Sequence, residues 1–218
     1  HPNIAHIYEF GSHNGYYFLA MEYVEGKTLR HFLKKNNPGL PTTLNLIKEI
    51  ARALSAAHKV GIIHRDIKPE NIIISKKRRV KILDFGLAKF KHSFSNSQET
   101  NGLFGSSLIT TPGMIIGTVA YMSPEQAENN PLDELTDIWS LGVLFYEMLT
   151  GQHPFLKESN IETLHCILKE PPAKFAEACE KLPEHVLNTA MKCIAKDKEN
   201  RIQSAPELLK ELELIQNT

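Results

Sequence analysis

Several features that would place a protein in a special class are scarce in this sequence of 218 residues. Basic and acidic side chains number 25 each, so there is no net charge at pH 7 and no dominant surface for nucleic acid or an anionic membrane is indicated. No apolar run approaches the roughly 20 residues needed to span a bilayer, and no signal peptide is expected. We therefore expect a cytoplasmic chain without a membrane segment.

Metal-binding and disulfide patterns are also lacking. The three cysteines are odd in number and form no C-x-x-C pair, and the ten histidines form neither H-E-x-x-H nor a Cys/His ligand cluster. Reduced, partly buried thiols and no zinc site are expected.

Apolar patterning predicts a small β element followed by a mostly helical body. Strand-like runs at 4–10 and 16–23 flank turn-forming residues and predict a hairpin, and short runs at 72–74 and 80–83 predict a second one around the basic turn 76–79. Residues 25–26 are expected to break the run at 16–23, and residues 38–41 are expected to form a loop. Helices are predicted at 28–35, 43–60, 136–150, 161–169, 184–195 and 205–216. The helix at 136–150 is apolar on almost every face, which predicts the buried centre of the helical body, and Gly151 is expected to end it.

Two loops have side chains suited to phosphoryl transfer. Residues 64–71, HRDIKPEN, lie between a long helix and a short hairpin, and they combine an imidazole, a guanidinium, a carboxylate, an ammonium and an amide. This chemistry needs a carboxylate to accept a hydroxyl proton, a group to hold metal and a cation to offset charge. A second carboxylate, Asp84, follows the run at 80–83 in the sequence DFG, where it suits a divalent metal that bridges phosphates.

These loops resemble motifs of the protein kinase superfamily: HRDIKPEN is similar to its catalytic loop and DFG to its metal loop. Ser123–Glu125 (SPE) resembles the A-P-E motif, and DIWSLG from Asp137 resembles the start of the buried central helix. Arg201 resembles the arginine that pairs with the A-P-E glutamate. The motifs follow the family's order over nearly the whole chain.

The resemblance implies an α+β, protein kinase-like fold. It would consist mainly of the helical C-lobe at 25–218, with a β-hairpin remnant of the N-lobe and the hinge at 1–24 and an activation segment at about 84–125. The family's glycine-rich loop, strand lysine and partner glutamate would precede His1. We therefore expect an N-terminally truncated kinase domain.

The resemblance also implies roles for individual residues. Asp66 would be the catalytic base, Lys68 would contact the transferred phosphate, and Asn71 and Asp84 would hold Mg²⁺. Residues around adenine would be Ile73, the gatekeeper Met21 and the hinge Glu22–Val24. Arg65 would receive a phosphate on the activation segment. Structural roles would fall to His64, Phe85, Gly86, Glu125, Asp137 and Arg201, with His64, Phe85 and Ile7 in one packed stack.

The acceptor is predicted to be serine or threonine. Lys68 resembles the Ser/Thr-kinase form of the catalytic loop, and Thr118 would bridge Asp66 and Lys68. The run GTVAYMSPEQ at 117–126 looks most like bacterial kinases of the eukaryotic-like type. Such kinases often carry a membrane anchor outside the catalytic domain, and dimerisation of the complete protein stays open.

Each feature has a structural alternative. A lone aspartate in a loop is most often a turn or capping residue, and only its place in HRDIKPEN favours catalysis for Asp66. Glu125 and Arg201 are expected to be a buried structural pair. Thr110 and Thr111 are either unmodified hydroxyls or phosphosites.

Two functions therefore compete. The first is a Ser/Thr protein kinase that uses ATP and Mg²⁺ on protein substrates, with little activity in these 218 residues alone because the ATP-covering lobe is absent. The second is a non-catalytic kinase-fold fragment or pseudokinase that acts as a binding module. Retention of Asp66, Asn71 and Asp84 favours the first.

Overall fold

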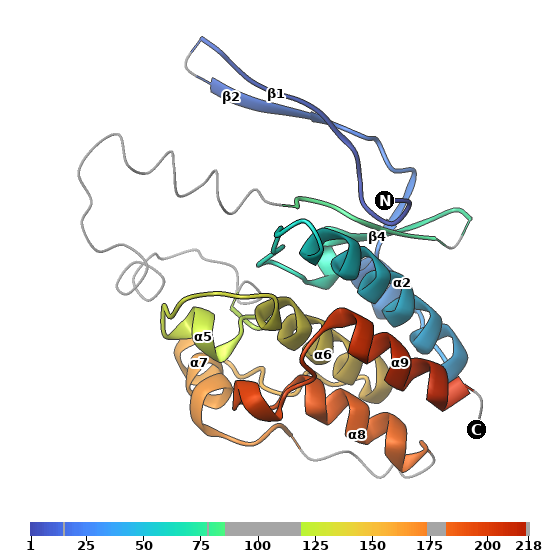
Figure 1. The fold of residues 1–218 in the computed structure, drawn as a ribbon, viewed down its shortest axis with the longest axis vertical. Coiled ribbons are helices and arrows are strands. Elements are labelled where there is room, and N and C mark those ends of the chain that lie inside the picture. Colours follow the sequence, from blue (N-terminus) through green and yellow to red (C-terminus); the bar gives the residue numbers. More distant parts are fainter. Residues whose placement is uncertain (15, 78, 86–118, 174–181, 217–218) are drawn as a thin grey trace.

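The computed structural model of the chain describes residues 1–14, 16–77, 79–85, 119–173 and 182–216. Strands lie toward the N-terminus and helices toward the C-terminus, as the α+β prediction expected (Figure 1). The elements in order are β1 (Ile7–His13), β2 (Tyr16–Met21), β3 (Gly26–Thr28), α1 (Leu29–Lys35), α2 (Leu40–His58), η1 (Pro69–Asn71), β4 (Ile72–Ser75), β5 (Val80–Ile82), α5 (Pro124–Ala127), α6 (Leu135–Thr150), α7 (Asn160–Lys169), α8 (Glu184–Cys193), η4 (Lys198–Asn200) and α9 (Ala205–Gln216).

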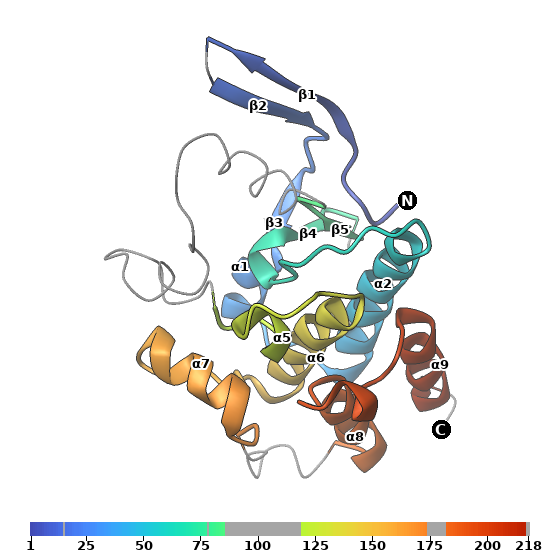
Figure 2. The same ribbon diagram turned by 60° about the vertical axis from the view of Figure 1, so that its left-hand side comes forward.

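The β1–β2 hairpin projects away from the helical body in both views (Figures 1 and 2). Its strands pair antiparallel, with a register shift between Ile7 and Glu9. Aromatic side chains cover it without being buried: Tyr8, Tyr16 and Tyr17 are 66%, 81% and 60% exposed. A two-stranded hairpin has little stability of its own, and these exposed rings form an apolar surface that the described part of the chain does not cover.

Three strands, β3, β4 and β5, form a second antiparallel sheet between the hairpin and the helices (Figure 2). The run at 16–23 is interrupted before residue 26, as expected, because β2 ends at Met21, but strand β3, which begins at Gly26 and pairs with Ser75 of β4, was not predicted. A β-carbon at Gly26 would lie 2.3 Å from the carbonyl oxygen of Ile74, so this pairing requires glycine. The N-terminal residues lie along β5, where Ala5 N donates to Ile82 O at 2.9 Å.

The helical core surrounds α2 and α6. Helix α2 begins at Leu40, inside the expected loop at 38–41, because Pro41 occupies its first turn and has no amide hydrogen to lose there. The apolar face of α2 is fully buried, and α6 is buried along nearly its whole length, as predicted. Gly151 ends α6 in the left-handed conformation, with φ 72°. None of the described helices is long and apolar enough to cross a membrane.

A close approach of α6 and α8 depends on Gly142. A β-carbon there would lie 2.4 Å from the β-carbon of Cys193, so any side chain would force the two helices apart. Cys166 and Cys193 are buried free thiols, whereas Cys179 lies outside the described residues.

The short helix α5 was not expected, although its signal is present in the sequence. Ser123 and Gln126 form a capping box: Ser123 Oγ accepts from Gln126 N at 3.3 Å, and Gln126 Oε1 accepts from Ser123 N at 3.0 Å. Pro124 follows as the first helical residue. By fixing the first turn of α5, the capping box orients the side chain of Glu125 toward the helical core.

Candidate active site

The buried carboxylate of Asp137 holds the loop at 64–71 in place. Asp137 lies in the first turn of α6 and is fully buried. Its Oδ2 accepts from His64 N and its Oδ1 from Arg65 N, both at 2.8 Å. Hydrogen bonds to a charged group are stronger than those between neutral groups. These two hydrogen bonds therefore hold the start of the loop against the central helix α6.

Asp66 lies between two donors. Lys68 Nζ donates to Asp66 Oδ2 at 2.8 Å, and Asn71 Nδ2 donates to the same oxygen at 3.0 Å and to Asp66 O at 2.8 Å. The Asp66 side chain is 46% exposed, whereas Lys68 is 18% exposed. The structure therefore brings together the three predicted residues of this loop and leaves the carboxylate accessible.

Asp84 is placed next to this cluster by backbone pairing. Leu83 N donates to Asn71 O at 2.8 Å, which brings the residue before Asp84 against the end of η1. Arg65 and Asp84 both adopt left-handed backbone conformations, with φ values of 70° and 61°. Such conformations cost a non-glycine residue on the order of 1–3 kcal/mol and concentrate at functional sites.

His64 and Phe85, two of the three residues predicted to form one stack, are in contact and join the two loops. The ring of His64 lies edge-on to Phe85 with centroids 4.6 Å apart, and its Nε2 is 2.8 Å from Leu83 O. Ile7, predicted for the same stack, lies on β1 and is 38% exposed. Gly86, Thr110, Thr111 and Thr118 were also predicted to serve the site, but they lie outside the described residues.

The predicted adenine-side residues are connected through Lys81 of β5. Lys81 Nζ donates to Glu22 Oε2 at 2.7 Å, and Lys81 pairs in register with Ile73 of β4. The hydrogen bond from Lys81, with a second from the backbone of His6, lowers the pKa of Glu22 below its ordinary value. Met21 ends β2 and is half-buried, as is Val24.

Sequence reasoning missed a second polar cluster beside the catalytic loop. Arg30 of α1 donates to Glu70 at 2.8 Å, to Glu147 of α6 at 2.7 Å and to the hydroxyl of Tyr121 at 2.6 Å. Tyr121 also bonds to Glu147. Burial, and then the charge of Glu147, raise the pKa of Tyr121 well above its ordinary value. Glu70 and Tyr121 lie inside the motifs, but nothing in the sequence around Arg30 marks it.

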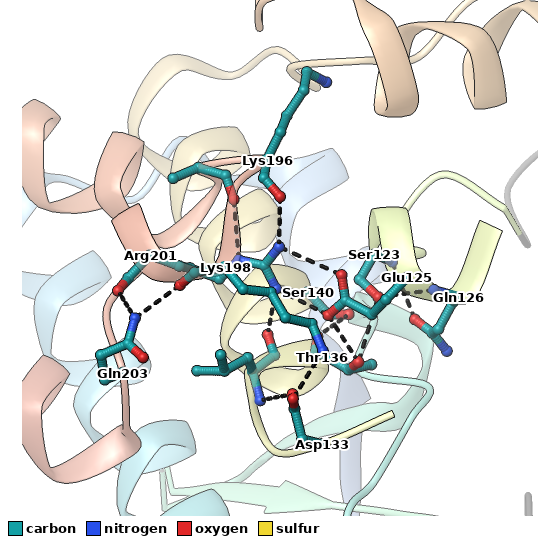
Figure 3. A network of polar contacts seen from close by, with 12 residues as sticks. Ser123, Glu125, Gln126, Asp133, Thr136, Ser140, Lys196, Lys198, Arg201 and Gln203 are labelled. Atoms are coloured by element: carbon teal, nitrogen blue, oxygen red, sulfur yellow. Dashed lines mark hydrogen bonds and ion pairs between the residues drawn. The ribbon is translucent and has the colours of Figure 1, made fainter. Parts of the chain in front are cut away.

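The pair Glu125–Arg201 ties the segment after residue 119 to the helical body (Figure 3). Arg201 Nη1 lies 2.9 Å from Glu125 Oε1, and the two side chains are 0% and 4% exposed. Burial alone would raise the pKa of Glu125, but the hydrogen bond and charge of Arg201 outweigh it and hold the pKa below its ordinary value. Gln126 Nε2 also donates to Arg65 O at 2.8 Å, so α5 contacts the catalytic loop directly.

Comparison with known proteins identifies sequences similar to this chain. The family described as protein kinase domain matches residues 1–212. A probable serine/threonine-protein kinase of Clostridium acetobutylicum is 36% identical over 216 residues, 99% of this chain and 31% of that protein. The serine/threonine-protein kinase PrkC of Bacillus subtilis is 36% identical over 211 residues, 95% of this chain and 30% of that protein. PknB of Mycobacterium leprae is 34% identical over 217 residues, 97% of this chain and 33% of that protein. The chain thus spans about a third of the length of these curated relatives.

Proposed function

The chain belongs to the protein kinase family, and from this premise we propose that the protein transfers the γ-phosphate of ATP to serine or threonine hydroxyls of protein substrates. The observation that carries the proposal is the cluster at Asp66. Its carboxylate is accessible and oriented by Lys68 and Asn71, beside a strained Asp84. The names of the similar bacterial kinases support the choice of serine or threonine.

Within this proposal Asp66 orients the substrate hydroxyl and accepts its proton. A carboxylate near half exposure can be reached by a substrate, and the hydrogen bond from Asn71 fixes its direction. The Lys68 ammonium group lies 2.8 Å from the same carboxylate, where it can offset negative charge on the transferred phosphoryl group.

The residues at the end of η1 fit a magnesium ion. Asn71 uses its amide nitrogen on Asp66, which leaves its amide oxygen for a metal, and Asp84 supplies a carboxylate. One carboxylate, one amide oxygen and the phosphates of a nucleotide are a donor set that Mg²⁺ accepts. Held by Asn71 and Asp84, a bound Mg²⁺ would supply positive charge that offsets the charge of the nucleotide phosphates. On the adenine side, we assign Met21, the hinge 22–24 and Ile73.

The proposal includes regulation by a phosphate group bound at Arg65. Arg65 Nε is buried and has no hydrogen-bond partner among the described residues. A buried donor without a partner supports the assignment of the Arg65 guanidinium as the group that binds a phosphate anion. We assign Thr110 and Thr111 as the modified residues and Thr118 as the bridge between Asp66 and Lys68.

The test measures phosphate transfer by the complete encoded protein and by residues 1–218, each with ATP and Mg²⁺. Asp66→Asn should lower the rate of the complete protein by about 10²- to 10⁴-fold, the range for losing a general base. Asp133→Asn makes the same chemical change at an exposed position and should leave the rate unchanged. Residues 1–218 alone should transfer little phosphate.

Four outcomes would contradict parts of the proposal. Full activity of Asp66→Asn would remove Asp66 from catalysis, and label found on tyrosine would refute the acceptor. A cellular role that survives Asp66→Asn would favour the binding module. Normal turnover by residues 1–218 would refute the expected need for a glycine-rich loop and strand lysine.

A further inference from the structure

The guanidinium of Arg30 joins three elements that lie beside the catalytic loop. Arg30 is in the first turn of α1, and each of its three nitrogens has a different partner. Nε donates to Glu70 of η1 at 2.8 Å, Nη1 to Glu147 of α6 at 2.7 Å, and Nη2 to the hydroxyl of Tyr121 at 2.6 Å. Because a guanidinium is planar and rigid, these contacts fix the three partners relative to one another.

Two of the three partners are held firmly by the helical core. Tyr121 is buried, its hydroxyl donates to Glu147, and its backbone oxygen accepts from Ser140 Oγ at 2.8 Å. The side chain of Glu147 is 15% exposed, whereas that of Glu70 is 48% exposed. Arg30 therefore ties the more exposed Glu70 to a part of the molecule that is already fixed.

Glu70 directly precedes Asn71, which orients the carboxylate of Asp66. Asn71 Nδ2 donates to Asp66 O at 2.8 Å and to Asp66 Oδ2 at 3.0 Å. The helix η1 that carries Glu70 and Asn71 has only three residues, and none of the described side chains caps its start. So short a helix has little stability of its own. The contact from Arg30 to Glu70 thus restricts the position of Asn71.

We propose that Arg30 is a positioning residue for phosphate transfer, which holds Asn71, and through it Asp66, by way of Glu70. The proposal rests on the proposed function and adds a residue to it. Arg30 acts through its neighbours and not on the reacting atoms. The residues assigned to the adenine side, Met21, the hinge 22–24 and Ile73, are not part of this cluster. Loss of Arg30 should therefore slow the transfer step and leave ATP binding unchanged.

The test is a double-mutant cycle in the complete encoded protein, with ATP, Mg²⁺ and dephosphorylated casein as the acceptor. Arg30→Gln and Glu70→Gln should each lower kcat about three- to fivefold, the effect of losing a partly exposed ion pair, with the KM for ATP unchanged. In the Arg30→Gln background, Glu70→Gln should have no further effect, because the two residues act through one contact. Since Glu70 is about half exposed, Glu70→Gln tests this contact without leaving a buried group unpaired.

The matched control is Arg79→Gln. Arg79 Nε lies 3.2 Å from Glu49 Oε1, and this pair joins the residue before β5 to α2 without any residue of the loop at 64–71. Removing it is the same chemical change and should leave kcat unchanged.

A second readout needs no turnover. The backbone N–H of Asn71 donates to Lys68 O at 3.0 Å, and its hydrogen exchange should be faster in Arg30→Gln and in Glu70→Gln, with no further increase in the double variant. If the wild type transfers no phosphate to casein or to itself, the proposed function fails, and the exchange cycle then decides whether Arg30 holds Asn71.

The proposal is overturned if Arg30→Gln transfers phosphate at the wild-type rate, or if the effects of the two single variants multiply in the double variant. It is also overturned if Arg79→Gln slows transfer equally, because the loss would then reflect stability alone. A higher KM for ATP without a lower kcat would refute it too, since the cluster would then act on nucleotide binding.

Discussion

Removing the charge of Glu125 should strongly destabilise the protein. Arg201 is fully buried, and its guanidinium donates to both oxygens of Glu125 and to three backbone carbonyls, those of Leu135, Ala195 and Lys196 (Figure 3). Glu125→Gln keeps the shape but leaves a buried cation without its counter-charge. Breaking a buried pair in this way costs about 3–5 kcal/mol. Because the three carbonyls remain, we expect the lower end, about 3 kcal/mol.

The chain contains a single tryptophan, and its position makes it a probe for this measurement. Trp139 is fully buried, and the guanidinium carbon of Arg201 lies 5.2 Å from its ring centroid. Urea unfolding followed by Trp139 fluorescence should show a midpoint about 1 M lower for Glu125→Gln. The matched control is Asp133→Asn, which removes the charge from the exposed pair Lys198–Asp133 and should cost at most about 1 kcal/mol.

The pH dependence of this difference has a definite sign. The folded state lowers the pKa of Glu125 below the ordinary 4.5, so its stabilisation is fully present above that value and is lost as pH falls through the lowered pKa. The gap between the wild type and Glu125→Gln should therefore narrow below about pH 4.5. The reasoning fails if Glu125→Gln costs no more than Asp133→Asn, or if the gap is the same at neutral and acid pH.

Three further predictions concern other parts of the fold. Gly142→Ala should lower the free energy of unfolding, measured in urea, by about 1–3 kcal/mol because the added methyl group pushes α6 away from α8. Gly39→Ala, where the nearest atom is 3.9 Å away, should leave this free energy nearly unchanged. Equal losses in the two variants would refute the close approach of α6 and α8. Burial, and then the charge of Arg30, lower the pKa of His153 to about 4, so its NMR resonances should not titrate between about pH 5 and 8; a midpoint near the ordinary value would contradict this. Because a neutral folded histidine gains a proton on unfolding, it should lower stability as pH falls from 6.5 toward 4. Arg30→Gln should speed amide hydrogen exchange at the end of the catalytic loop, because it removes the ion pair with Glu70. Arg52→Gln, on the exposed side of α2, should not change this exchange. Equal exchange rates in the two variants would show that the Arg30 cluster does not hold the loop.

Local patterns predicted the helices well. The apolar period of α2 and the all-round burial of α6 were visible in the sequence, and Gly151 ends α6 in the conformation that glycine favours. Boundaries were less accurate, since α2 begins at Leu40 and α8 ends at Cys193. Helix ends depend on caps and neighbours that a periodic pattern does not include.

Strand β3 shows where local reasoning failed. Gly26 was expected, with Glu25, only to break the run at 16–23, and no strand was predicted to begin there. Its pairing with Ser75, far along the chain, instead uses the missing side chain to bring β3 close to β4. A short strand of this kind forms because it pairs with a strand that is distant in the sequence. Its own residues show no alternating apolar pattern that would predict it.

The candidate site also has features that the sequence predicted and features that only the structure revealed. The sequence by itself determined the identity of the reactive groups, because HRDIKPEN and DFG supply Asp66, Lys68, Asn71 and Asp84 within short segments. Their roles remain predictions, and Thr118 lies outside the described residues. Only the tertiary structure decided that Arg30 joins Glu70 to Glu147 and that His58 of α2 contacts the buried carboxylate of Asp137. The physical reason is that motifs and periodicity report local chemistry, whereas a polar contact between distant elements exists only after the helices have packed and excluded water.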